Sequence, residues 1–233
     1  MNATTLASTQ LLRLLHLASP GLPVGAYSYS QGLEAAIEAK HVTDEAGTGA
    51  WIADVLAFSV ARLEAPVWCR LYHAWDIDDD DAIAHWSSFF MASRDTAELR
   101  AETVQMGYSL ARLLRELFPA DARVSRFPPD LTHAMIPYPS AMALACVVLG
   151  TPLEASLHAY LFSWAENQVL AALKAVPLGQ VAGQRLLFAL EPQLLAAAAT
   201  ALLLADDDIA NWTPGLSFLC MRHETQYSRI FRS

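Results

Sequence analysis

The segment from Cys220 to Ser233 gathers side chains that could bind another protein. It is basic and aromatic, although the whole chain carries a net charge of −9 at pH 7. Arg and Tyr dominate interface hot spots because they combine a large contact area with directed hydrogen bonds. The residues of this kind are Arg222, His223, Glu224, Gln226, Tyr227, Ser228, Arg229, Phe231 and Arg232.

Ordering about a dozen such residues costs on the order of 18 kcal/mol. A segment this polar is not expected to recover that free energy by burial against its own chain. We therefore predict that it needs a receiving surface on a partner. The alternative is a frayed, solvated end of the chain, which the aromatic content disfavours.

Two pairs of side chains have the spacing of metal ligands. Cys69 precedes His73 by one helical turn, and Cys220 precedes His223 by three residues. A nickel or zinc site normally has more than two protein ligands. We interpret all four as structural, with Cys220 and His223 as weak candidates for a metal site.

Sequence motifs of common enzymes are incomplete or absent. Neither a P-loop nor the glycine pattern of dinucleotide-binding folds occurs. His223 and Glu224 begin a zinc-protease motif, but Tyr227 stands where the second histidine is required. The acidic run from Asp76 fails as a calcium loop, because Asp81 stands where the turn needs glycine. The sequence therefore does not predict an enzyme.

A second polar group lies within the apolar stretch from Ser163 to Gln184. Helical spacing sets Glu166 and Asn167 on neighbouring faces of one helix, and Gln180 opens the next helix after a turn. Two interpretations remain open, namely a buried polar network that fixes helix ends and a surface for a partner. The candidate residues are Glu166, Asn167, Lys174, Gln180 and Gln184.

These residues must be positioned by helices, because apolar residues recur at helical spacing and strand-like alternation is nearly absent. We predict an all-α fold. The predicted helices are one ending at Ser19-Pro20-Gly21, one ending at Glu38, one that follows Asp44, is interrupted near Pro66 and resumes through Trp75, one from Asp78–Asp81 to Met91, and others at Ser93–Phe118, Ser140–Leu149, Pro152–Ala175 and Gly179–Ala205.

Several local features of these helices follow from the sequence. Ser28 or Ser30 is expected to cap the helix that ends at Glu38, and Asp44 the next one. The carboxylates at Asp78–Asp81 suit a helix N-terminus. Burial of five leucines on the first helix would contribute about 10 kcal/mol. They are Leu11, Leu12, Leu14, Leu15 and Leu17.

The composition indicates one soluble domain that has partners. The 233 residues contain no linker-like stretch, so residues 1–233 are predicted to form a single domain. With 54% hydrophobic and 17% charged residues, some apolar surface is expected to face a partner or a second copy. The acidic chain lacks a basic patch for nucleic acid, and no uninterrupted run of about 20 apolar residues predicts a membrane span. Three widely spaced cysteines suit a reducing cytoplasm.

Four stretches of the sequence, taken in order, resemble the UreF family of urease accessory proteins. They are Leu17–Glu34, Arg100–Tyr108, Trp164–Gln184 and His223–Ser233, and the likeness covers essentially the whole chain. Two departures are conservative: Ala26-Tyr27 stands where Gly-Phe is common in the family, and Ile230 where leucine is usual.

The resemblance implies a multi-helix bundle of roughly nine or ten helices that is usually dimeric and has no catalytic activity. It also implies a complex with UreD (also called UreH) and the GTPase UreG that assembles the nickel centre of apo-urease. The complex, rather than this chain, would handle nickel and GTP, and this chain would modulate the GTPase activity of UreG. In one variant, Arg222 or Arg229 would reach UreG as an arginine finger.

The resemblance also implies roles for particular residues. The N-terminal segment 1–20 and the tail 220–233 become the expected partner-docking elements. The residues expected to contact UreD are Tyr227, Ser228, Arg229, Phe231, Arg232 and Ser233. The loop residues expected near that interface are Tyr27, Ser28, Tyr29 and Glu34.

Two other functional hypotheses remain. One is a nickel-binding metallochaperone that acts through the Cys/His pairs, and the other is an independent helical enzyme.

Overall fold

The structure is a computed structural model of the chain, and residues 6–233 are described. Within this range the chain is helical and contains no strand, so the predicted all-α fold is confirmed. The helices are α1 (Ser8–Ala18), α2 (Leu33–Glu38), α3 (Glu45–Val55), α4 (Ala65–Asp76), α5 (Asp80–Ala92), α6 (Ala97–Leu117), α7 (Tyr138–Val148), α8 (Leu153–Ala175), α9 (Gln180–Ala189), α10 (Glu191–Leu203) and α11 (Pro214–His223).

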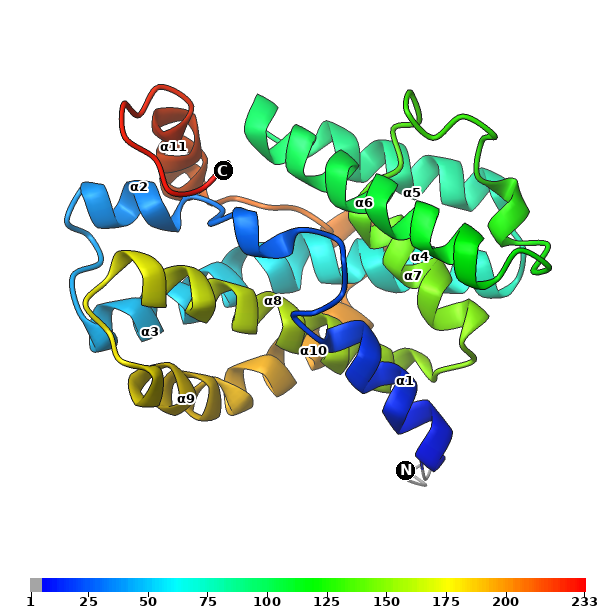
Figure 1. The fold of residues 1–233 in the computed structure, drawn as a ribbon, viewed down its shortest axis with the longest axis horizontal. Coiled ribbons are helices and arrows are strands. Elements are labelled where there is room, and N and C mark those ends of the chain that lie inside the picture. The colour runs from blue at the N-terminus through cyan, green and yellow to red at the C-terminus, as the bar shows by residue number, and fades with distance from the viewer. Residues whose placement is uncertain (1–5) are drawn as a thin grey trace.

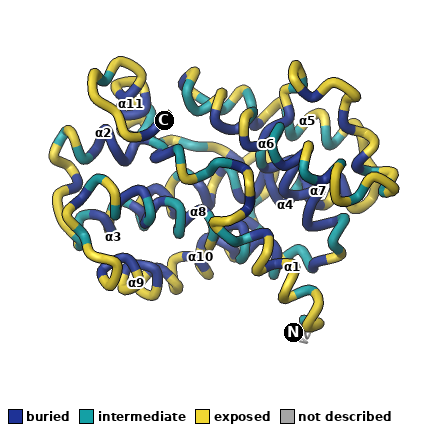
Figure 2. The backbone as a smooth tube through the Cα atoms, in the orientation of Figure 1, coloured by how far each residue is buried: buried dark blue, intermediate teal, exposed yellow. Residues whose placement is uncertain are grey.

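Helix α4 lies at the centre of the bundle. It packs against α5 and α7 on one side and against α8 and α10 on the other (Figure 1). Its Trp68 and Leu71 side chains are fully buried, and the Trp68 ring stacks on Tyr160 of α8. Buried residues continue from α5 and α7 through α4 to α8 and α10 (Figure 2), so one hydrophobic core joins the helices on both sides of α4.

The expected interruption near Pro66 is wrong. Residues 45–76 form one uninterrupted helix, in which Leu56–Glu64 is a π-helical segment between α3 and α4. The Ala65 amide still donates to the carbonyl of Val60, five residues earlier. Pro66 then stands in the first turn of α4, where a missing N–H group costs little. The wider turn therefore accommodates the proline without ending the helix.

The expected burial of the first-helix leucines is also wrong in part. Leu14 and Leu17 are buried, whereas Leu11, Leu12 and Leu15 are exposed. Helix α1 packs mainly against α8 and projects from the bundle (Figure 1), so one stripe of its surface is covered.

Two of the three predicted helix caps agree with the structure, whereas the N-cap of α2 is Gly32 rather than Ser28 or Ser30. The side chains of Asp44 and Asp79 accept the backbone N–H groups of Gly47 and Ala82 at 2.8 and 2.9 Å. Before α2, the Ser30 hydroxyl accepts the Glu34 amide at 3.3 Å. The acidic run at residues 78–81 thus serves the helix N-terminus.

The C-terminal third of the chain differs from the sequence-based expectation. The predicted helix Gly179–Ala205 is two helices, α9 and α10, with a bend of 44° between them, at Leu190. Pro192 causes this break, because it has no N–H group to donate to the Phe188 carbonyl four residues earlier and its ring crowds that carbonyl. Helix α11 was not predicted. No single helix among residues 6–233 combines the length and composition of a membrane span; α9 and α10 reach them only together.

Two glycines allow close contacts between elements. A Cβ atom at Gly107 of α6 would lie 2.0 Å from the carbonyl oxygen of Ile136. At Gly32, which has a φ of +84°, a Cβ atom would lie 2.9 Å from the sulfur of Cys220. The second contact brings α11 against α2 and so positions the start of the C-terminal segment.

Candidate functional site

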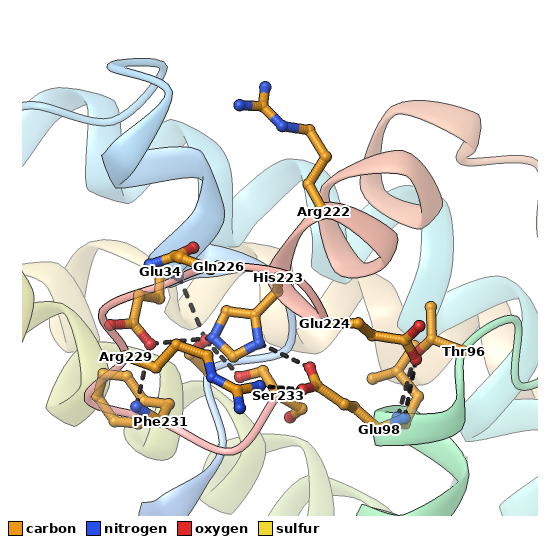
Figure 3. Close-up of polar contacts among 12 residues, drawn as sticks. Glu34, Thr96, Glu98, Arg222, His223, Glu224, Gln226, Arg229, Phe231 and Ser233 are labelled. Atoms are coloured by element: carbon orange, nitrogen blue, oxygen red, sulfur yellow. Dashed lines mark hydrogen bonds and ion pairs between the residues drawn. The ribbon is translucent and has the colours of Figure 1, made fainter.

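The C-terminal segment folds back on its own chain. Helix α11 ends at His223, and residues 224–233 return along α2 towards the start of α6 (Figure 1). A group of four side chains, which we call the clasp, joins these elements. It consists of Glu34 from α2, Glu98 from α6, His223 from α11 and Arg229 from the returning segment (Figure 3).

Glu34 binds the returning backbone. Its Oε1 atom accepts the Ile230 amide at 2.7 Å, and its Oε2 atom accepts the Phe231 amide at 3.0 Å. The Glu34 side chain is almost completely buried. A carboxylate with two backbone donors is well compensated for its loss of water, so Glu34 fixes the path of the segment.

His223 is the buried centre of the clasp. Its ring is 0% exposed, with Nε2 lying 3.0 Å from Glu34 Oε2 and Nδ1 2.7 Å from Glu98 Oε2. The Arg229 guanidinium contacts the other Glu98 oxygen at 2.5 Å. Three elements that are distant in sequence are therefore held together by one imidazole ring.

The last residues are fixed by a second set of contacts. The Ser233 carbonyl accepts hydrogen bonds from the amide and the hydroxyl of Ser30, at 2.8 and 2.6 Å. The Ser233 hydroxyl donates to Glu102 of α6 at 2.6 Å, and the Arg232 amide donates to the Ser28 carbonyl at 2.8 Å. Burial raises the pKa of the Glu102 carboxyl to about 7, against the opposing hydrogen bonds from Ser233 and Gln31.

The neighbouring Glu224 caps α6 from outside that helix. Its Oε1 atom accepts the amides of Ala97 and Glu98 at 2.7 and 3.2 Å. A carboxylate is favourable there because of the free N–H groups and the positive end of the helix dipole. The His-Glu pair, which resembled an incomplete zinc-protease motif, therefore joins α11 to α2 and α6.

The expectation that the tail could not be buried on its own chain is wrong in part. Phe231 is buried in a small apolar cluster with residues of α2 and α8, and His223 and Ser233 are buried as well. In contrast, Tyr227 is 105% exposed and Ile230 is also exposed. The segment thus has an inner face that binds its own chain and an outer face that is open.

Hydrogen bonds join the loop at residues 27–29 to α8, and a side chain of α8 contacts the C-terminal segment. The Tyr29 carbonyl accepts Asn167 Nδ2 at 3.2 Å, and the Tyr27 carbonyl accepts Lys174 Nζ at 3.2 Å. Lys174 Nζ also lies 5.4 Å from the centre of the Phe231 ring, within the range of a cation–π contact. Burial raises the pKa of the Tyr29 phenol, as does the charge of Glu102.

The remaining predicted polar residues lie apart from the clasp. Glu166 is half-buried on α8, where burial raises the pKa of its carboxyl. It borders a cleft that residues of the 19–27 loop also line. Gln180 and Gln184 are exposed on α9. The predicted polar network therefore includes the partly buried Asn167, whereas Lys174 binds the Tyr27 carbonyl from an exposed position and the two glutamines lie apart.

The Cys/His pairs do not have the geometry of metal sites. Both nitrogens of His223 face carboxylates, while Cys220 packs against Gly32. Cys69 is buried and His73 is exposed. Burial raises the thiol pKa of both cysteines to about 12, which disfavours the thiolate that binds metal. Among residues 6–233, no group of three or more His, Cys, Asp or Glu side chains has metal-binding geometry.

Sequence reasoning identified Glu34 but missed Glu98 and Glu102. A signal was available, because Glu102 is one helical turn before the buried Met106 and so lies on the apolar face of α6. A charged residue on such a face needs a buried partner. Its partner, Ser233, is 131 residues away and could not be named from spacing.

The chain is similar to known proteins over most of its length. The UreF family model matches residues 42–191. The urease accessory protein UreF of Janthinobacterium sp. (strain Marseille) is 56% identical over 223 residues, covering 96% of this chain and 98% of that protein. UreF of Nitrosospira multiformis is 51% identical over 96% of this chain and 97% of that protein.

A further relative is a fusion. The bifunctional urease accessory protein UreEF of Bordetella bronchiseptica is 50% identical over 98% of this chain, and the match covers 53% of that longer protein. The family model matches more than half of the chain, and the relatives match nearly all of it. The chain belongs to the UreF family of urease accessory proteins.

Proposed function

We propose that this chain is a non-catalytic assembly factor that, together with UreD (UreH) and the GTPase UreG, inserts nickel into apo-urease. Its place in the UreF family supports this role. The observation that carries the proposed mode of action is the two-faced tail, whose inner face binds α2 and α6 and whose outer face is free. A surface of this kind presents preformed contacts to a partner.

The outer face is the proposed contact for UreD. It displays the exposed Tyr227 and Ile230, together with the exposed part of Arg229, whose guanidinium also binds Glu98 in the clasp. Tyr and Arg are residue types enriched in hot spots. Arg222 points away from the clasp (Figure 3) and is exposed. Phe231 and Ser233, which the sequence assigned to the same interface, would act indirectly by holding the tail.

The N-terminal segment 1–20 is a second proposed docking element. Residues 1–5 lie outside the described part of the chain. Within α1, the exposed Leu11, Leu12 and Leu15 form an apolar surface of the kind that interaction sites use.

The proposed assembly includes a homodimer, contacts with UreG and a cytoplasmic location. Val181 and Phe188 lie two turns apart on α9 and are exposed, as is Leu195 on α10. These apolar side chains are the ones that we propose a second copy would bury. The cytoplasm suits three free, buried cysteines. We assign nickel and GTP to the complex, because the Cys/His geometry does not favour the metallochaperone alternative.

Co-expression with UreD and UreG, followed by size-exclusion chromatography, tests this proposal. Truncation before Ser228 would also remove the buried Phe231, so a point substitution is sharper. We expect Tyr227→Ala to weaken UreD binding about tenfold or more, as at an interface hot spot. The variant should retain the wild-type helical circular dichroism, because this side chain is fully exposed.

Leu117→Ala is the matched control. Leu117 is also exposed but lies at the other end of α6 from the clasp. It should bind UreD like the wild type. Undiminished binding by Tyr227→Ala would overturn the assignment of the outer face, and a wild-type chain that elutes alone would overturn the proposed complex.

A further inference from the structure

His223 occupies an unusual position for a histidine. Its fully buried ring has a carboxylate oxygen within hydrogen-bonding distance of each nitrogen, Glu34 on one side and Glu98 on the other (Figure 3). A neutral imidazole carries a proton on only one nitrogen, so it can donate only one of these bonds. Two charged acceptors therefore fit a ring that carries both protons.

The charges around the ring also favour the form that carries both protons. Arg229 is the cation in direct contact with the clasp carboxylates, and it binds Glu98. With a neutral ring, Glu34 and Glu98 would share this single guanidinium in a largely buried site. A buried carboxylate without a compensating charge is costly. A protonated ring balances the two carboxylates.

Other titratable groups near the ring lie on each packed element. On α6, Glu102 follows Glu98 by one turn. Directly after α11, the carboxylate of Glu224 is directed to the α6 amides. Cys220 of α11 is influenced by Arg94 and Asp95 from the segment before α6, as well as by Glu98 and Glu102. These groups contribute to the local field, but none of them contacts a nitrogen of the ring.

We infer that doubly protonated His223 is a positioning residue that holds residues 224–233 in the docked conformation, so that docking of the tail takes up one proton. Glu34 links the two events, because the same carboxylate accepts His223 Nε2 and the amides of Ile230 and Phe231. Loss of a ring proton turns one attraction into a contact between a lone pair and a carboxylate. Glu34 is then no longer held in place by the ring, so the Ile230 and Phe231 amides lose a rigid acceptor.

This inference rests on the proposed function in one respect. Tyr227 and Arg229 belong to the docked segment, so release of the segment would disperse the proposed UreD contact. By linkage, the docking equilibrium should fall by up to about tenfold per pH unit above the pH at which the undocked ring loses its proton, about 6.5 for an ordinary histidine, and should level off once the docked ring is deprotonated as well. UreD binding should follow the same profile.

The direct test uses the isolated full-length chain labelled with ¹⁵N at histidine. Ring ¹⁵N shifts report the protonation of His223 between about pH 5.5 and pH 9.5, and hydrogen exchange reports protection of the Ile230 and Phe231 amides. We expect a doubly protonated ring wherever the amides are protected, and a joint loss of both. A neutral ring in a chain whose amides stay protected would overturn the inference.

Glu98→Gln provides a second readout if the wild-type ring holds its proton throughout that range. It removes the charge facing Nδ1 while keeping a similar shape, so ring deprotonation and loss of amide protection should both move to lower pH. Tyr227→Ala should leave both profiles unchanged. Unshifted profiles in Glu98→Gln would contradict the role of His223.

The two proposals fail in distinguishable ways. The ring and amide measurements need no partner, so they stand even if UreD does not bind. If the ring titrates with the tail but UreD affinity is independent of pH, the positioning role holds and the outer face is not the contact.

Discussion

Glu102 is the buried acid that carries a consequence for stability. Burial raises the pKa of its carboxyl from 4.5 to about 7 in the folded chain. The folded state therefore holds this proton more tightly than the unfolded state. The stabilisation is fully present below about pH 4.5 and is lost as the pH rises through about 7.

We expect Glu102→Gln to remove this dependence. From pH 4.5 to pH 7.5 the free energy of unfolding of the wild type should fall relative to the variant by an amount on the order of 3 kcal/mol. Urea unfolding of both proteins across this range measures the difference. If the free energies of unfolding of the two proteins change equally with pH, Glu102 titrates as an ordinary exposed glutamate.

For individual residues, the sequence predicted which positions are important better than it predicted their contacts. Glu34 and His223 both lie in segments that resemble the UreF family, and Asp44 and Asp79 follow from local capping rules. The contact between His223 and Glu34 spans 189 positions. Contacts of this range depend on how helices pack, which spacing along the chain does not contain.

At the scale of elements, Gly107 determines how α6 meets the segment before α7. Because an added methyl group would overlap the Ile136 backbone carbonyl, we expect Gly107→Ala to destabilise the chain by about 3 kcal/mol. Urea unfolding provides the measurement.

Gly215→Ala is the matched control. Gly215 lies in the first turn of α11 and has no atom within 4 Å of an added Cβ, so alanine should be neutral or should stabilise by up to about 1 kcal/mol. Equal effects of the two substitutions would contradict the close packing at Gly107.

Helix ends were predicted well where a capping side chain marks them and poorly where proline decides. Pro66 was expected to interrupt a helix, but the preceding π-helical segment places it where its missing amide is tolerated. Pro192 was overlooked, although it separates α9 from α10. Helix α11 was not predicted, although Leu216, Leu219 and Cys220 lie at helical spacing, because it is short and begins with Pro214-Gly215, a pair that is typical of a turn.

At the scale of the whole molecule, the fold gives the tail two faces. Packing of α11 against α2 brings His223 to the start of α6, and the returning segment then covers an apolar cluster. Composition predicted that the tail would seek a surface. It did not show that the chain itself supplies a first surface and leaves the second for a partner.

On the proposed function, this chain is needed to load nickel into urease. Apo-urease, UreD and UreG are produced together, with and without this chain, and the nickel bound per urease active site is measured by atomic absorption. We predict nickel-loaded urease only when the chain is present, and markedly less nickel with Tyr227→Ala than with Leu117→Ala. Equal nickel content with and without the chain would contradict the account.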